Sequence, residues 1–169
     1  MAEPRPIVAF CGPGDPAPEE RQQAERIGRL IGERGWTLVC GGLGGAMEAA
    51  CAGAKEAGGT TIGILPGYDA AAANSWIDLA ICTGMGQARN AIIVATARIV
   101  IACGGGFGTL SEIALAQRLR RPVVLLGGWG PPLDTSEAHY LIERHAGDIR
   151  LATTPEEAIA FVAATLATP

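Results

Sequence analysis

Short apolar runs alternate along the chain with longer segments in which apolar residues recur every three to four positions. The short runs are continuous, which is typical of strands covered on both faces of a parallel sheet. The longer segments have the spacing of amphipathic helices that bury one face. We predict strands at 6–10, 36–40, 60–65, 77–81, 99–103, 122–126 and 149–152, and helices at 18–34, 46–57, 87–97, 109–119, 135–144 and 155–166.

The order of these segments, strand then helix almost throughout, predicts a doubly wound α/β fold with a parallel sheet. A length of 169 residues suits one domain, and the sequence contains no internal repeat and no second apolar core. We therefore expect residues 1–169 to form a single Rossmann-like domain.

Composition and charge exclude several classes of partner. The 13 Lys and Arg against 17 Asp and Glu give a net charge of -4, and aromatic residues are only 5%, so we expect no nucleic-acid partner. The longest apolar run, 91–103, is interrupted by Arg98 and is too short to span a bilayer, and residues 1–6 have no signal-peptide core. Five cysteines without a CxxC pair favour a reducing compartment. We expect a cytoplasmic protein without a membrane partner.

Glycine clusters at 12–14, 41–45 and 104–108 each join a predicted strand to a predicted helix. In a parallel sheet such turns lie at the carboxyl edge, where ligands bind. Glycine lets backbone approach a ligand, and helix starts offer unpaired N–H groups, so together they favour a phosphate or another oxyanion. One such turn alone can be an ordinary connection, and neither the P-loop pattern nor the full dinucleotide fingerprint is present. The glycines expected to bind the ligand are Gly12, Gly14, Gly41, Gly42, Gly44, Gly45, Gly105, Gly106 and Gly108.

Four side chains near these turns could supply the chemistry. Arg89 follows a glycine-rich turn, where a guanidinium is either a solvated surface group or a phosphate partner. Asn90 could bond a base or cap a helix, and Thr109 could cap a helix or bond an anion oxygen. Glu112, expected in the first helical turn, is either a capping carboxylate or a ligand-facing group. In the second case it would bond sugar hydroxyls or stabilise positive charge at a glycosidic carbon.

A family resemblance is carried by 41–48, 58–63, 84–90 and 105–112. These segments resemble the LOG superfamily, and the resemblance covers most of the chain. The best-known members are cytokinin riboside 5′-monophosphate phosphoribohydrolases, which release base and ribose 5-phosphate and carry a PGGxGTxxE motif with an upstream arginine. The resemblance places the motif on 104–112, with the catalytic glutamate at Glu112 and the catalytic arginine at Arg89.

Two positions depart from that pattern, because Gly104 stands where the family has proline and Asn90 where it has lysine. A second branch, the molybdenum cofactor carrier proteins and their bacterial relatives, is more similar in 84–90, 112–116 and 121–127. That branch binds a phosphorylated pterin or related anions without chemistry. The resemblance therefore implies a carrier of a nucleotide or of molybdenum cofactor, and we expect no required cofactor and no metal site.

Two other functions are alternatives. In a phosphoribohydrolase, Arg89 would bind and orient the nucleotide, and Glu112 would stabilise the oxocarbenium-like transition state and help to place water. In a non-catalytic interaction module, the glycine turns would be incidental. Superfamily members were formerly labelled lysine decarboxylases, but that chemistry normally needs pyridoxal phosphate on a lysine. The single lysine, Lys55, lies in the predicted helix 46–57, so we reject that function.

Three cysteines, Cys11, Cys40 and Cys103, each end a predicted strand beside a glycine turn. If those strands are neighbours, the thiols could line one pocket edge and contact a soft metal or molybdenum. Cysteine in such a position is more often a small buried hydrophobe, and we expect that role here.

The helical segments 89–97 and 109–119 are apolar around much of their surface. A helix of this kind is buried either in its own core or against a partner. The resemblance implies dimers, or tetramers in the carrier branch, through this region. We expect a homodimer or homotetramer; the alternative is that the C-terminal segment covers both helices.

Overall fold

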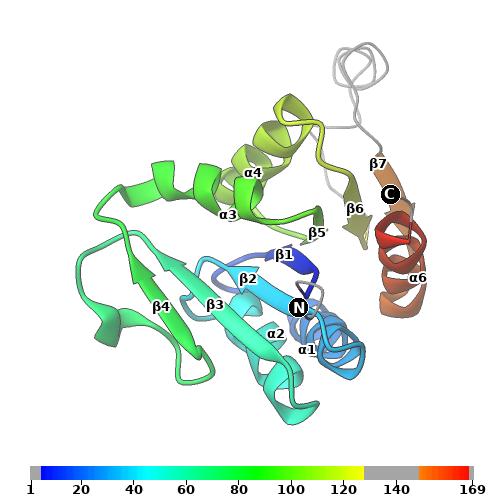
Figure 1. Cartoon of the computed structure of the whole chain (residues 1–169), viewed down its shortest axis with the longest axis horizontal. Coiled ribbons are helices and arrows are strands. Elements are labelled where there is room, and N and C mark those ends of the chain that lie inside the picture. The colour runs from blue at the N-terminus through cyan, green and yellow to red at the C-terminus, as the bar shows by residue number, and fades with distance from the viewer. Residues whose placement is uncertain (1–4, 128–148, 168–169) are drawn as a thin grey trace.

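A computed structural model describes residues 5–127 and 149–167, and the predicted helix 135–144 lies outside these residues. The described part is a seven-stranded parallel sheet with helices on both faces (Figure 1), which confirms the doubly wound α/β prediction. The strands are β1 (Ile7–Cys11), β2 (Thr37–Cys40), β3 (Thr60–Leu65), β4 (Leu79–Cys82), β5 (Ile99–Cys103), β6 (Val123–Leu126) and β7 (Ile149–Ala152). The helices are α1 (Pro18–Glu33), α2 (Ala46–Glu56), α3 (Asn90–Thr96), α4 (Phe107–Arg118) and α6 (Pro155–Leu166), with short 3-10 turns at η1 (Ala70–Ala72) and η2 (Gly86–Arg89).

The strand order is β4-β3-β2-β1-β5-β6-β7. Strands β2, β3 and β4 follow one another on one side of β1, and β5, β6 and β7 follow one another on the other side. Val8 of β1 is paired with Leu38 of β2 and with Ile99 of β5. The order therefore reverses between β1 and β5. At such a switch point an open α/β sheet leaves a crevice beyond the carboxyl ends of its strands.

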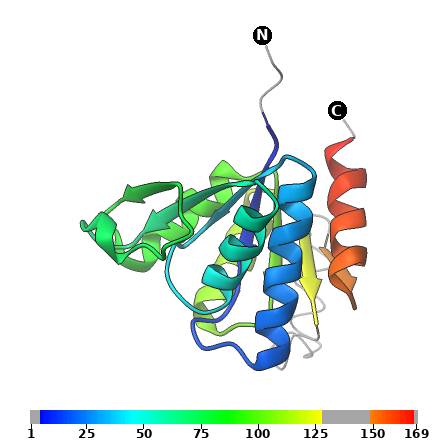
Figure 2. The ribbon, with the colours of Figure 1, turned by 90° about the horizontal axis from the view of Figure 1, so that it is seen from below.

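The sheet divides the apolar core into two layers. Val8 and Phe10 of β1 pack with α1, α2 and α6, whereas Ala9 and Cys11 pack with α3 and α4. Figure 2 shows α1 and α2 side by side on the first of these faces. Because both faces are covered, successive strand residues are buried, and this is why the strands are continuous apolar runs in the sequence.

Glycines lie where α1 and α2 touch, and they let the two helices approach closely. A Cβ at Gly28 of α1 would come within 1.8 Å of the carbonyl oxygen of Ala50, and one at Gly53 of α2 within 2.0 Å of that of Glu25. The backbone of each helix thus rests directly on the other. This contact fixes the position of α2 and of the loop that leads into it from β2.

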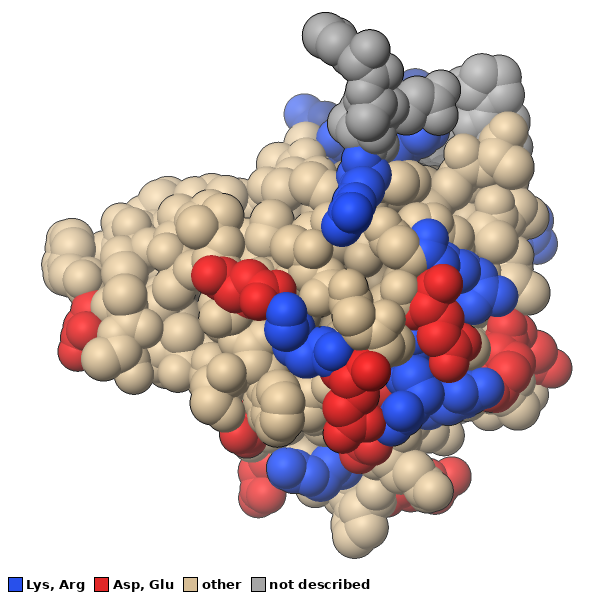
Figure 3. Space-filling view, turned by 60° about the horizontal axis from the view of Figure 1, so that its bottom comes forward, with Lys and Arg blue, Asp and Glu red and all other residues tan. Residues whose placement is uncertain are grey.

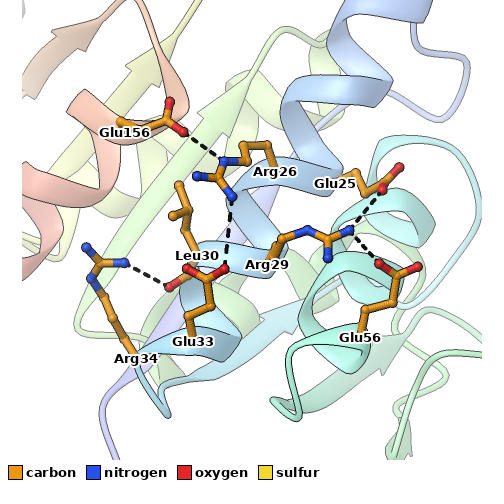
Figure 4. Close-up of polar contacts among 8 residues, drawn as sticks. All are labelled: Glu25, Arg26, Arg29, Leu30, Glu33, Arg34, Glu56 and Glu156. Carbon is orange, nitrogen blue, oxygen red and sulfur yellow. Dashed lines mark hydrogen bonds and ion pairs between the residues drawn. The ribbon is translucent and has the colours of Figure 1, made fainter.

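The outer surface of the α1 and α2 layer carries charges of both signs, close together (Figure 3). Figure 4 shows Arg26 and Arg29 of α1 reaching Glu156 of α6 and Glu56 of α2, at 2.7 and 2.5 Å. These side chains are exposed, so water and salt screen both pairs and they contribute little to stability. Within the ranges 5–127 and 149–167, no helix is long and apolar enough to cross a membrane.

Two helix boundaries differ from the prediction. The segment 87–97 divides into η2 and α3, because Gly84 and Gly86 both have positive φ and the chain enters through a tight turn. The helix α4 begins at Phe107, earlier than expected, since Gly106 is its N-cap. The other described strands and helices agree closely with the predicted ranges.

Replacing Gly28 with alanine should destabilise the protein, because the new methyl group would collide with the Ala50 carbonyl and push α1 away from α2. Overpacking of this kind costs about 1–3 kcal/mol, which lowers the melting temperature of a chain of this size by several degrees. Thermal unfolding followed by circular dichroism measures the change. Gly67→Ala is the control, since a Cβ at Gly67 meets nothing within 4 Å. Equal melting temperatures for both variants would contradict the close helix contact.

Candidate functional site

A cavity of about 300 Å³ lies at the carboxyl ends of β1, β2 and β5, beside the switch point of the sheet. Its walls come from the turn after β1, the loop between β2 and α2, the turn η2 and the start of α4. The glycine turns that the sequence places at one edge therefore do converge. The lining residues are Gly12, Pro13, Gly14, Leu43, Met47, Gln87, Arg89, Asn90, Gly106, Gly108, Thr109 and Glu112.

Arg89 supplies the positive charge of this cavity, and its side chain is buried rather than solvated. The residue is 6% exposed, and arginine is rarely so buried unless it is paired. Its Nη1 donates to Asn90 Oδ1 and lies 4.0 Å from Glu112 Oε1. Its Nε is buried without a hydrogen-bond partner, and no described residue accepts from Nη2. The Nε–Nη2 edge thus has no acceptor among the described residues, and two parallel N–H groups of this kind match two oxygens of a phosphate or carboxylate.

Gly41 makes room for this guanidinium. A Cβ at Gly41 would lie 2.5 Å from Nη2 of Arg89 and 2.9 Å from Sδ of Met47. Gly41 itself does not line the cavity, although the sequence analysis predicts it as a ligand-binding residue. The structure also places four other predicted glycines outside the lining, namely Gly42, Gly44, Gly45 and Gly105.

The loop between β2 and α2, which contains Gly41, Gly42, Gly44 and Gly45, is held by hydrogen bonds to Asn74. The backbone N–H of Asn74 donates to the Gly42 carbonyl at 2.8 Å, and its side-chain Nδ2 donates to the Leu43 carbonyl at 2.9 Å. Leu43 is thereby held in the cavity wall. The glycines of this loop act on the site through the path of the backbone.

Glu112 enters the same cavity from α4. It is 6% exposed and lies in the second turn of the helix, not in the first turn as predicted, because α4 begins at Phe107. It therefore does not cap the helix. Burial raises the pKa of its carboxyl to about 7, although Cys11 and Arg89 beside it favour the ionised form. Near neutral pH this carboxyl can hold or release a proton.

Asn90 makes different contacts from those expected. It is 2% exposed, and it does not cap α3, whose N-cap is Arg89. Its Oδ1 accepts from Arg89, and its Nδ2 lies 2.8 Å from Ser111 Oγ and 3.4 Å from the Gly108 carbonyl oxygen. The amide N–H groups are thus used within the protein and are not free to bond a base.

The turn from β5 into α4 is built by glycines. Gly104 has a φ of 60°, which the proline expected from the family resemblance cannot adopt, because its ring fixes φ near −65°. A Cβ at Gly105 would lie 2.2 Å from Oγ1 of Thr109, so Thr109 is buried beneath the turn. Thr109 does not cap α4, since Gly106 is the N-cap and no side chain bonds there. The first N–H groups of α4 therefore have no side-chain cap beside the cavity.

The three strand-end cysteines are buried but do not share a pocket. β2, β1 and β5 are neighbours, yet Cys40 and Cys103 lie in the core under α1 and α2, whereas Cys11 lies in the opposite core. Burial raises the pKa of the Cys103 thiol to about 12. In the described part of the chain, no group of three or more His, Cys, Asp or Glu could hold a metal ion. The three thiols are thus buried, as expected, but they also contact polar groups: Cys40 Sγ lies 3.3 Å from the Gly42 nitrogen, and Cys103 Sγ lies 3.6 Å from Gln23 Oε1.

Four residues that line the Arg89 cavity are not predicted from the sequence, namely Pro13, Leu43, Met47 and Gln87. None of them has a side chain with a characteristic chemistry. Their one signal is position, because each lies within or just after a glycine turn that was itself predicted.

A second hollow of about 510 Å³ runs along α1 and α6. Arg26 and Arg29 are the cations of its wall, and each is already paired with a carboxylate (Figure 4). Its wall also contains further carboxylates, Glu19 and Glu25. It is therefore less suited to an anion than the cavity at Arg89.

Comparison with known proteins adds three relatives. A family model described as the SLOG cluster4 family matches residues 5–159. The solved structure of the molybdenum cofactor binding protein from the phototrophic bacterium Rippkaea orientalis is 39% identical, with a TM-score of 0.87 over 98% of this chain and 99% of that one. The molybdenum cofactor carrier protein from Chlamydomonas reinhardtii is 38% identical, with a TM-score of 0.84 over 98% and 100%. The cytokinin riboside 5′-monophosphate phosphoribohydrolase of Mycobacterium tuberculosis is 30% identical over 134 residues, 73% of this chain and 71% of that protein. The resemblance to the LOG superfamily and its carrier branch is confirmed.

Ionisation of Glu112 should lower the stability of the protein as the pH rises from 5 to 8. The folded chain raises the pKa of this carboxyl, so the stabilisation is complete at low pH and is lost as the pH passes through about 7. Relative to Glu112→Gln, the wild type should lose on the order of 3 kcal/mol of unfolding free energy. Urea unfolding of both proteins at pH 5 and pH 8 measures the difference. A parallel pH response would show that Glu112 does not titrate in this range.

Proposed function

This chain belongs to the SLOG cluster4 family, and we propose that it binds a phosphorylated small molecule in the Arg89 cavity and carries it without chemical change. The observation that carries this proposal is the Nε–Nη2 edge of a buried guanidinium at the switch point of the sheet, which has no acceptor among the described residues. A buried donor that lacks a partner is costly. An oxyanion that enters the cavity would supply the missing acceptors.

The charges around the cavity favour an anion over a neutral ligand. Arg89 is accompanied by one carboxylate, Glu112, at 4.0 Å. Since the pKa of that carboxyl is about 7, it balances the guanidinium only in part at neutral pH. The start of α4 adds the partial positive charge and uncapped N–H groups of a helix N-terminus. A phosphate with two oxygens on Arg89 and a third near Gly106 would satisfy both groups.

The volume of the cavity and the proteins to which this chain is similar support a phosphorylated pterin as the ligand. A volume of about 300 Å³ is small for a ligand site and suits a phosphate with part of an attached ring or sugar. Leu43 and Met47 give this space an apolar side. The similarity to molybdenum cofactor binding and carrier proteins supports molybdenum cofactor as the cargo. A nucleotide is the second candidate, and neither ligand needs a resident cofactor.

Hydrolysis of a nucleoside monophosphate is the second candidate function, and Glu112 favours it. Its carboxyl lines the cavity beside Arg89 and titrates near neutral pH. In this reading Arg89 would orient the phosphate, and Glu112 would stabilise positive charge on the ribose and help to place water. The similarity to the Mycobacterium tuberculosis phosphoribohydrolase supports this alternative.

We also infer that copies of the chain associate through α3 and α4, as a dimer or a tetramer. The charged residues of these two helices are Glu112, which is buried, and Arg118 at the end of α4. Ile92 and Leu115 are only partly buried. In contrast, the α1 side of the molecule is rich in charges (Figure 3). The final helix, α6, packs on that charged side, against α1 and β6.

Arg89→Ala should weaken the binding of AMP and of a monophosphorylated pterin by about 10- to 100-fold, because charge-assisted hydrogen bonds are lost. Isothermal calorimetry measures both affinities. Arg98→Ala is the control, since it removes an exposed arginine just before the amino end of β5. Unchanged affinity in Arg89→Ala would contradict the anion site. If the wild type bound neither probe, an interaction module would be favoured instead.

Incubation of the protein with AMP distinguishes a carrier, which leaves AMP intact, from a hydrolase, which releases adenine. We expect no free adenine by chromatography. Adenine released by the wild type but not by Glu112→Gln would make the chain a phosphoribohydrolase, provided that Glu112→Gln still binds AMP. A group that acts only in the transition state alters turnover and leaves affinity in place.

Light scattering should give a mass two or four times that of one chain. Leu115→Glu should dissociate the assembly, because it puts a charge in the middle of the uncharged α3 and α4 surface. Leu151→Glu is the control, since Leu151 is 81% exposed on β7, at the far edge of the sheet. A monomeric wild type would overturn this inference, and so would an assembly that Leu115→Glu leaves intact.

A further inference from the structure

A chain of hydrogen bonds runs from Arg89 through Asn90 and Ser111 to the first turn of α4. Nη1 of Arg89 bonds to Oδ1 of Asn90, and Nδ2 of Asn90 lies 2.8 Å from Oγ of Ser111. Oγ of Ser111 lies 2.7 Å from the Gly108 carbonyl oxygen, which is also 3.4 Å from Nδ2 of Asn90. Asn90 is 2% exposed, so water does not compete for its amide.

Because the Arg89 guanidinium can only donate and the Gly108 carbonyl can only accept, the direction of every hydrogen bond between them is fixed. The Gly108 carbonyl can only accept, so Ser111 gives it the one hydrogen of its hydroxyl. Oγ of Ser111 must then accept from Asn90, which turns the NH2 of the amide toward α4. The amide oxygen is left on the side of Arg89, whose guanidinium can only donate. The neighbours of Asn90 therefore set the orientation of its amide.

This orientation determines which part of Arg89 is available. Nη1 donates to Asn90 and lies 4.0 Å from the Glu112 carboxylate, so the nitrogen atoms with no partner among the described residues are Nε and Nη2, which form one edge of the planar group. We infer that Asn90 and Ser111 are positioning residues that fix the guanidinium of Arg89 against α4 through Nη1 and thereby leave the Nε–Nη2 edge for a ligand. The inference rests on the proposed function, since the selected edge is the one that the phosphate would contact.

The same arrangement specifies the group that is recognised. Two N–H donors on one rigid edge match two oxygen atoms on a single centre, as in a phosphate monoester. A side chain at position 90 must accept from Arg89 and donate to Ser111 at the same time. Asparagine does both, whereas aspartate offers acceptors alone. The site therefore binds a phosphate monoester through the N–H groups on Nε and Nη2 of Arg89, and Asn90 and Ser111 set the orientation of this guanidinium.

Variants of both residues test the positioning role, with AMP or the monophosphorylated pterin as probe, whichever binds the wild type more tightly. Asn90→Ala should weaken binding about tenfold and Ser111→Ala about threefold, because Arg89 loses its fixed orientation. Ser111→Thr keeps the hydroxyl and should restore the wild-type affinity. The Arg89 Nε–H resonance in ¹H–¹⁵N spectra should shift in the two alanine variants and return in Ser111→Thr, which a purely structural role would not produce.

Thr96→Ala is the matched control, because it removes a hydroxyl that bonds to the Ile92 carbonyl at 2.6 Å on α3, away from the cavity lining. Affinity and resonance should both stay unchanged in it. If Asn90→Ala does not fold, Asn90→Asp replaces it and should weaken binding and shift the resonance. Folded variants of Asn90 and Ser111 with wild-type affinity and an unmoved resonance would overturn the inference. A wild type that binds no phosphorylated probe would overturn the proposed function, and the resonance alone would then decide the positioning role.

Discussion

A guanidinium buried at the switch point of the sheet is the constraint on which this site depends. Taking a charge out of water is costly unless neighbouring groups compensate for the lost solvation. Gly41 leaves space for Arg89, Asn90 accepts one of its hydrogen bonds, and Glu112 brings a carboxylate whose charge varies near neutral pH. These contacts involve Nη1 and leave the Nε–Nη2 edge without an acceptor among the described residues. The guanidinium of Arg89 is thereby held in position, and its Nε and Nη2 can still donate hydrogen bonds.

The helical layer on the other face of the sheet supports this site from a distance. The close contact at Gly28 and Gly53 holds α2 against α1, and the loop before α2 places Leu43 in the cavity wall and Gly41 against the guanidinium of Arg89. The charged outer surface of α1 suits contact with water. The α3 and α4 side holds Arg89, Asn90 and Glu112. The two faces of the sheet thus differ in role: one supports the backbone of the site, and the other supplies its charged groups.

The sequence is sufficient for the fold, because burial on both faces leaves continuous apolar runs and the glycine turns mark where strands end. It is less informative about the site. Whether Arg89 is solvated or buried depends on the space at Gly41, in a different turn of the chain. The contacts of Asn90 depend on Ser111, which lies on another helix. The turn that holds Glu112 depends on where Gly106 starts α4. The burial of Arg89, the contacts of Asn90 and the helical position of Glu112 all depend on residues outside their own local sequence pattern.

The pairing of β1 with β5 has a consequence for folding kinetics. Val8 lies beside Ile99, about ninety residues later in the chain, and contacts of such separation form slowly, because a long loop must close first. The first four strands can associate earlier, but they leave one edge of β1 open until β5 is synthesised. Arg89 is made before β5, and Glu112 after it. In a growing chain the Arg89 cavity can therefore form only late, after β5 has paired with β1 and α4 has followed it.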